Sequence, residues 1–134
     1  MAGLSMIEGI GEKYAAQLKS AGVRSMGALL KAGSDKKGRK ELAKKSGLQE
    51  KQILNWVNRA DLARIKGIGT QYADLLECTG VDTVPELARR KSVNLHAKMM
   101  EINSVKKLVR QIPSLAQVHR WVKQAKELPR VVTH

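Results

Sequence analysis

A seventeen-residue segment occurs twice in this chain, and the duplication constrains the fold more than any other feature. IEGIGEKYAAQLKSAGV covers residues 7–23, IKGIGTQYADLLECTGV covers residues 65–81, and nine positions are identical. A second pair follows, because ILNWVNRA at 53–60 and VHRWVKQA at 118–125 share Trp-Val and a final Ala. Such recurrence in the same order indicates one duplicated structural unit. We therefore expect a first repeat over residues 1–58 and a second over residues 59–134, with inserted residues within 91–112.

The local signals in both repeats are helical. Gly22 and Gly80 stand where a left-handed residue would end the helix that follows Gly-Ile-Gly. Ser25 is placed to begin a short helix, and either Ser34 or Asp35 can cap the basic helix that Gly47 ends. Thr83 and Glu86 in the second repeat, like Ser114 and Gln117 before the last helix, have the spacing of a capping box.

Apolar residues at helical spacing predict the two longest helices. One is expected over residues 49–66 and would run into the second Gly-Ile-Gly, and the other begins after Ser114 and ends at Pro129. No segment has a convincing strand pattern, and the absence of Phe leaves a core of aliphatic residues and Met. The sequence therefore predicts an all-α fold, with Trp56, Trp121, Tyr14 and Tyr72 in its packing.

Charge indicates the class of partner. Twenty-five Lys and Arg against twelve Asp and Glu give a net charge of +13, and residues 1–58 hold eleven of the basic side chains. A field of this size on a small folded protein attracts polyanions, with nucleic acid as the first candidate. No run is long enough for a membrane span, and Cys78 is the only cysteine. A lone cysteine agrees with a reducing interior, so we expect a soluble, cytoplasmic protein.

Gly-Ile-Gly followed by a helix has a chemical consequence of its own. The glycines allow a tight hairpin and leave the backbone amides without covering side chains, while the Ile points into the core. Exposed amides at the beginning of a helix, aided by its dipole, suit a phosphate group. Such a contact reads no base, and it therefore predicts binding without sequence preference.

The pattern shared by IEGIGEKYAAQL and IKGIGTQYADLL resembles that of helix-hairpin-helix proteins. The chain also resembles a bacterial and archaeal family of paired helix-hairpin-helix domains with no assigned function, in the segments KGRKELA (37–43), ILNWVNRADL (53–62), RIKGIG (64–69) and VDTVPELA (81–88). The resemblance implies two tandem helix-hairpin-helix repeats, each followed by short helices, packed as one compact unit. It also implies nonspecific binding of duplex DNA through phosphates.

Carried onto this chain, the resemblance assigns phosphate contacts to the amides of Gly9, Ile10 and Gly11 and of Gly67, Ile68 and Gly69, with Thr70 beginning the second helix. Related hairpins often have a Lys two residues after the second Gly. Lys13 fits this pattern and Gln71 does not, so we expect the first hairpin to be the better DNA ligand. Some related hairpins hold a monovalent cation, and the sequence leaves open whether the hairpins of this chain do so.

The basic run between residues 31 and 45 supplies a second set of candidate DNA ligands, Lys36, Lys37, Arg39 and Lys40. Arg89, Arg90 and Lys91 form a shorter basic run in the second repeat. If the protein binds DNA, we expect it on the nucleoid.

Two alternatives remain open. The same hairpins could bind a protein partner, and residues 43–57 match a helix-turn-helix spacing that would allow base readout. Catalysis is not expected, because His96, His119, His134 and Cys78 have no metal-ligand spacing and no nucleophile-base pattern is present. No cofactor is predicted, and the oligomeric state is left open.

Overall fold

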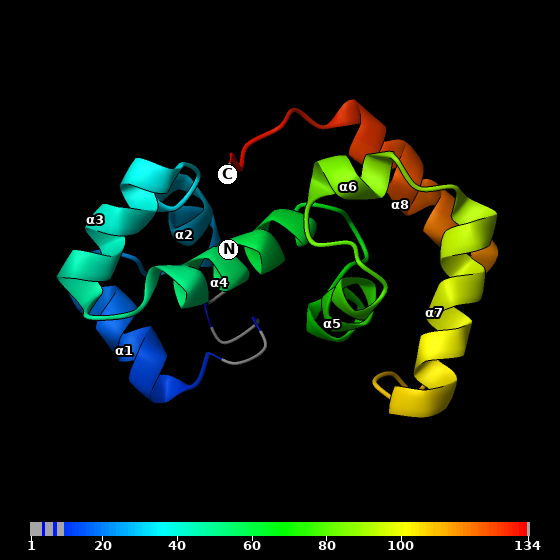
Figure 1. Cartoon of the computed structure of the whole chain (residues 1–134), viewed down its shortest axis with the longest axis horizontal. Coiled ribbons are helices and arrows are strands. Elements are labelled where there is room, and N and C mark those ends of the chain that lie inside the picture. Colours follow the sequence, from blue (N-terminus) through cyan, green and yellow to red (C-terminus); the bar gives the residue numbers. More distant parts are fainter. Residues whose placement is uncertain (1–3, 5–6, 8–9, 134) are drawn as a thin grey trace. The chain divides into compact units, whose positions relative to one another are not determined.

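The computed structural model describes residues 4, 7 and 10–133, and no strand occurs among them (Figure 1). This part of the chain forms the helices α1 (Glu12–Ser20), α2 (Met26–Ala32), α3 (Lys36–Ser46), α4 (Glu50–Leu62), α5 (Thr70–Cys78), α6 (Val84–Ala88), α7 (Ser92–Lys106) and α8 (Leu115–Glu127). The expected all-α class is confirmed.

The chain divides into two compact units. Unit 1 comprises Met1–Asp61 and Val131–His134, and unit 2 comprises Leu62–Arg130. The division therefore lies near the end of α4, a few residues after the boundary expected at residue 58. The amide of Thr133 donates to the Ser34 carbonyl at 2.7 Å, which ties the end of the chain to unit 1.

The two units contain the same succession of helices. α1 and α5 have nine residues each, and α4 and α8 have thirteen each. α7, with fifteen residues, is longer than the eleven-residue α3, and a longer connection separates it from α8. The insertion expected within 91–112 thus lies in α7 and the connection after it.

Each unit has its own aliphatic core. Leu18, Leu29, Ile53 and Val57 are fully buried in unit 1. The corresponding core of unit 2 is built around Leu75, Leu76, Leu87, Leu95, Met99 and Trp121. Burial of these side chains supplies most of the stabilisation of helices that would be marginal alone.

A tyrosine and a tryptophan pack together in each unit. The rings of Tyr14 and Trp56 have centroids 5.3 Å apart at 52°, and those of Tyr72 and Trp121 are 5.3 Å apart at 55°. Trp56 is 3% exposed and Trp121 is 1% exposed. The prediction that these residues serve the packing is confirmed, and each pair joins the first helix of its unit to α4 or α8.

Most predicted helix ends are confirmed. The side-chain oxygens of Ser25, Asp35 and Ser114 each accept the amide hydrogen of the residue three positions later, at 3.1, 2.7 and 3.1 Å. Asp35, and not Ser34, is therefore the cap of α3. Gly22 and Gly80 have φ of 91° and 93°, as their role in ending α1 and α5 requires.

Two helix-end predictions are wrong. The helix expected over 49–66 ends at Leu62, where the chain enters the turns that lead to the second Gly-Ile-Gly. Thr83 does not cap α6 with its side chain. Its hydroxyl instead donates to Glu86 Oε1 at 3.2 Å, while the Asp82 amide donates to Glu86 Oε2 at 3.4 Å. The Glu86 carboxylate thus accepts hydrogen bonds from both residues that precede α6.

We predict that Asp35→Ala lowers the free energy of unfolding by about 1 kcal/mol, because α3 loses the carboxylate that accepts the Gly38 amide. Ser34→Ala is the matched control, since its hydroxyl donates to the Lys31 carbonyl and caps no amide. Guanidinium denaturation followed by circular dichroism measures both. An equal loss in the two variants would contradict the assigned cap.

Candidate nucleic-acid interface

The segment before each of α1 and α5 is built from two successive turns. In unit 2 the Ile65 amide donates to the Leu62 carbonyl at 3.1 Å, and the Ile68 amide donates to the Ile65 carbonyl at 3.2 Å. In unit 1 the Ile7 amide donates to the Leu4 carbonyl at 3.0 Å, and the Ile10 amide donates to the Ile7 carbonyl at 3.2 Å. The apolar side chains at these positions are buried. Their spacing of three residues brings them to one side of the turns, where they anchor the segment in the core.

This geometry corrects two of the predicted phosphate ligands. The amides of Ile10 and Ile68 donate to carbonyls within the turns, so neither is presented to a ligand. The two side chains occupy the cores, as expected. Gly9 lies outside the described residues. The amides that follow, at the starts of α1 and α5, can face a ligand.

Gly11 and Gly69 begin α1 and α5 in nearly the same conformation. Their φ and ψ are −89° and −175° for Gly11, and −94° and −170° for Gly69. Both are exposed, no side chain caps either helix, and a Cβ built on either glycine would meet nothing within 4 Å among the described residues. The amides of the first helical turn have no acceptor within the helix, so each start can accept an anion.

Gly67 has a structural role in addition to its predicted one. Its φ is 96°, and a Cβ there would lie 3.0 Å from Trp121 Nε1. The preceding amide, of Lys66, donates to Gln124 Oε1 at 2.9 Å. The turn before α5 is therefore fixed against α8 by contacts that only glycine permits at residue 67.

The side chains beside the two helix starts differ. Lys13 is exposed in the first turn of α1, but so is Glu12, which adds a negative charge beside the same amides. α5 begins with Thr70, its first turn carries no acidic residue, and Gln71 is exposed. The positive charge that Lys13 adds at the start of α1 is thus offset by Glu12.

Of the four predicted ligands in the basic run, the structure exposes three. Lys36, Lys37 and Lys40 are exposed on α3. Arg39 is only 4% exposed, and its Nη1 donates to the Gly33 carbonyl at 2.9 Å. Arg39 therefore supports the connection between α2 and α3, which corrects its assignment as a DNA ligand. A buried arginine in a lysine-rich run cannot be distinguished from its neighbours by composition.

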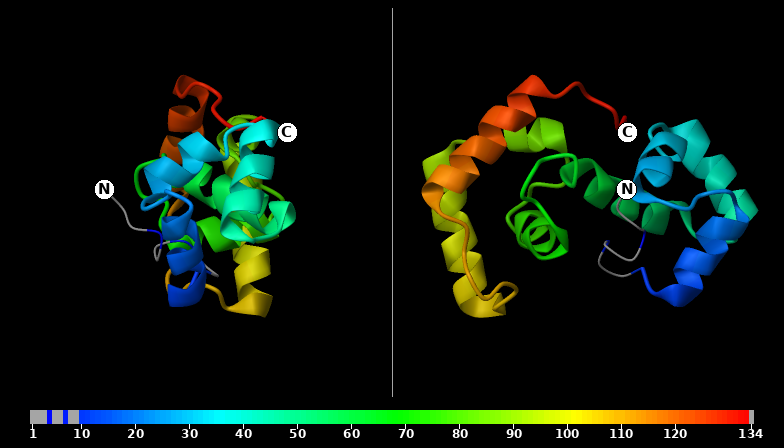
Figure 2. Two further views of the ribbon diagram at one scale, coloured as in Figure 1. Left: turned by 90° about the vertical axis from the view of Figure 1, so that its left-hand side faces the viewer. Right: turned by 180° about the vertical axis from the view of Figure 1, so that it is seen from behind.

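The exposed lysines of α3 and the start of α1 occupy different ends of unit 1. The first turn of α3 lies at the end of the unit opposite to the first turn of α1 in all three views (Figures 1 and 2). The last residue of α3, Ser46, is the one near α1, since its carbonyl accepts from Gln17 Nε2 at 3.3 Å. The two predicted contact sets of unit 1 are thus separate surfaces.

The helix-turn-helix alternative gains no support from α4. Ile53, Trp56 and Val57 of this helix are buried in the core of unit 1. Glu50, Lys51 and Asn55 are exposed on its other side, and an acidic residue at the helix start does not favour a DNA groove.

The described residues contain no group of three or more His, Cys, Asp or Glu placed to hold a metal ion. His96 contacts the Pro113 carbonyl at 2.9 Å, and His119 contacts Ser92 Oγ at 3.2 Å. Within the same part of the chain, no helix is long and apolar enough to cross a bilayer.

Fold and candidate site together define a basic, duplicated, all-helical protein with two open helix starts. A family model described as "Domain of unknown function (DUF4332)" matches residues 8–128, and the chain belongs to this family. No curated protein and no solved structure matches the chain.

We predict that Gly67→Ala lowers the free energy of unfolding by about 1–2 kcal/mol, because a left-handed non-glycine residue is strained and its Cβ would press on Trp121. Gly69→Ala is the matched control, with an extended backbone and open space at its Cβ. We expect it to change stability by less than about 0.5 kcal/mol. Thermal or guanidinium unfolding compares the two, and equal losses would contradict the distinct roles of these glycines.

Proposed function

We propose that this protein binds duplex DNA without sequence preference, with one phosphate at the start of α1 and another at the start of α5. In this proposal the two segments that end at Gly11 and Gly69 are helix-hairpin-helix motifs. The observation that carries it is the repetition of one open, glycine-begun helix start in both units. A single open helix start has many explanations. Two similar helix starts on a chain with a net charge of +13 favour a ligand with repeated negative charges.

The physical basis is a match between donors and phosphate oxygens. Three amides of each first turn point out of the helix without an internal acceptor, and the helix dipole adds partial positive charge there. Glycine keeps side chains away, so a bulky backbone phosphate can approach the amides. These contacts are the same for every base pair, which is why the proposal excludes sequence readout.

The exposed lysines of α3 add a second, longer-range contribution. They belong to the first half of α3, whose first turn lies at the opposite end of unit 1 from the first turn of α1 (Figure 2). They would contact other phosphates than those held by the hairpin, and their attraction is screened by salt. Binding of this kind would keep the protein on the nucleoid.

Protein interaction is the second candidate function. Its support is on α7, where Val93 is 65% exposed and Val105 is 79% exposed, with Met100 also outside the core. Scattered exposed apolar residues are common, however, and these do not include the hairpins. DNA binding therefore remains the better-supported proposal.

We predict that Gly11→Asp and Gly69→Asp each lower the affinity for duplex DNA about tenfold or more, a loss of about 1.4 kcal/mol. The new carboxylate would cap the helix, occupy the amides and repel phosphate. Since Asp is a better N-cap than Gly, the stability of each variant should be equal or slightly higher. Fluorescence anisotropy with a labelled duplex of arbitrary sequence measures the affinity.

Asn55→Asp is the control for these two variants, because it adds the same charge at an exposed position of α4. We expect it to weaken binding less than about threefold. For the unmodified chain, log affinity should fall with log salt at a slope of roughly −3 to −5 if about three to six phosphates are neutralised. No binding in dilute buffer, or a flat salt response, would refute the proposed function.

We predict that the triple variant Lys36→Gln, Lys37→Gln, Lys40→Gln weakens binding to all duplex sequences equally. If each lysine neutralises one phosphate, the salt slope becomes less negative by about 2–3. The control replaces Lys98, Lys106 and Lys107 of the α7 region by Gln, which removes the same charge. Equal losses in the two triple variants would show that only net charge matters and would exclude a contact patch on α3.

A further inference from the structure

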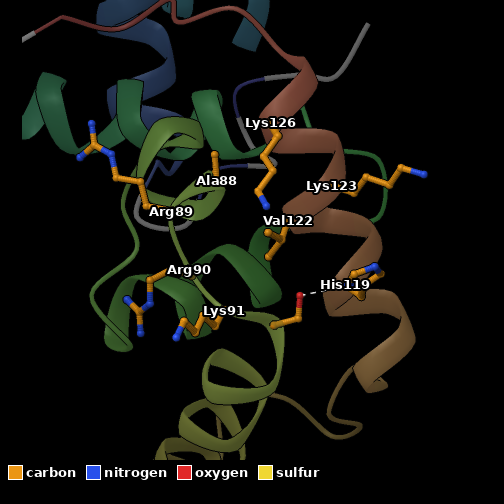
Figure 3. A pocket seen from close by; sticks show the side chains of 9 residues that line it. Ala88, Arg89, Arg90, Lys91, His119, Val122, Lys123 and Lys126 are labelled. Carbon is orange, nitrogen blue, oxygen red and sulfur yellow. Dashed lines mark hydrogen bonds between the residues drawn. The ribbon is translucent and has the colours of Figure 1, made fainter.

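Unit 2 contains a basic pocket that plays no part in the proposed hairpin contacts. It has a volume of about 300 Å³ and lies where the end of α6, the start of α7 and one side of α8 meet (Figure 3). The residues that line it are Ala88, Arg89, Arg90, Lys91, Ser92, His119, Val122, Lys123 and Lys126. The volume is at the lower end of that of small-molecule sites.

The lining has the composition of an anion site. Five of the nine described lining residues are Lys or Arg, and none is Asp or Glu. In Figure 3 the amino group of Lys126 extends over Val122 toward the interior, whereas Arg89 and Lys123 point outward at the rim. Ser92 Oγ and His119 Nδ1, 3.2 Å apart, add polar atoms at one side. Cations on the rim and polar groups within would attract an anion and then orient it.

Backbone amides reinforce the side chains. α7 begins at Ser92 after the N-cap Lys91, whose side chain cannot accept a hydrogen bond, and the first turn has no acidic residue. The first-turn amides therefore lack both an intrahelical acceptor and a side-chain cap. In unit 1 the carboxylate of Asp35 fills the same place at the start of α3. An anion in the unit 2 pocket would replace the missing carboxylate.

Comparison of the two last helices shows that these charges are not required by the repeated fold. α4 and α8 have equal length, and Trp56 and Trp121 fix their correspondence. In this register, His119, Lys123 and Lys126 replace Leu54, Asn58 and Asp61 of α4. At these three positions unit 2 thus has a histidine and two lysines, where unit 1 has an apolar, an amide and an acidic side chain.

We propose that this pocket binds a phosphate group, held by Lys91 and Lys126, by the amides that begin α7, and by Ser92. Arg90 is already restrained, because its Nη1 donates to the Thr79 carbonyl at 3.3 Å, and it contributes charge at the wall. The phosphate belongs either to a small phosphorylated molecule or to a nucleic-acid end. The proposal does not depend on hairpin binding to DNA, since none of its residues lies in the segments before α1 or α5.

The test is an NMR titration of the full chain with inorganic pyrophosphate at constant ionic strength. We expect saturable shifts of the Ser92 to Leu95 amides and of the His119 ring, with half-saturation at about 1 mM or below. Lys91→Gln with Lys126→Gln should weaken binding at least about tenfold. Lys98→Gln with Lys106→Gln, equal in charge and outside the pocket, should leave it unchanged.

Further ligands identify the source of the phosphate. Saturation by adenosine monophosphate but not by adenosine indicates a small molecule, and stronger binding of a 5′-phosphorylated duplex than of the unphosphorylated duplex, lost in the double variant, indicates a nucleic-acid end. The Gly11→Asp and Gly69→Asp variants should retain full pyrophosphate affinity, which separates this site from the hairpins. Shifts that do not saturate, or equal weakening by both double variants, would overturn the proposal.

Discussion

In each unit, the packing of one tyrosine on one buried tryptophan holds the start of the first helix in place. Tyr14 and Tyr72 stand in the first turns of α1 and α5, and Trp56 and Trp121 fix them to α4 and α8. A helix start is a useful anion site only if its amides are held still and left uncovered, because ordering them on binding would cost affinity. The ring pair restrains the first turn of each helix, and Gly11 and Gly69 leave its amides uncovered by side chains.

Features decided by neighbouring residues were predictable from the sequence. The caps at Ser25, Asp35 and Ser114 and the left-handed glycines after α1 and α5 follow from local backbone chemistry. The all-α class followed from helix caps and helical apolar spacing, and the duplication predicted that one arrangement of helices occurs twice. The end of α4 was misplaced because the apolar spacing continues through Ile65, where the chain in fact enters turns.

What was missed depends on contacts between distant segments. Arg39 differs from the exposed lysines of the same run in its burial and in its bond to Gly33, and this contact follows from how α2 meets α3. The amides of Ile10 and Ile68 were predicted to bind phosphate, because a Gly-Ile-Gly pattern does not show which amides donate to carbonyls within the turns. The basic pocket joins residues of α6, α7 and α8. Its sequence signals were the basic run from Arg89 to Lys91 and a mismatch between the repeats, because Lys91 stands at the helix start where unit 1 has the cap Asp35.

That mismatch suggests how a duplicated protein of this kind acquires distinct surfaces. Positions alike in both units, such as the Tyr–Trp pairs and Gly11 with Gly69, maintain the same packing and the same helix start twice. Exposed charged positions that differ, such as Lys36 and Lys37, lie outside this core, so they can change with little effect on stability. Unit 1 places its additional charge on the exposed side of α3, as dispersed lysines, whereas unit 2 places it around a concave site. A dispersed row suits a long polyanion and a concave cluster suits a single compact one, because the number of simultaneous contacts is set by the shape of each surface.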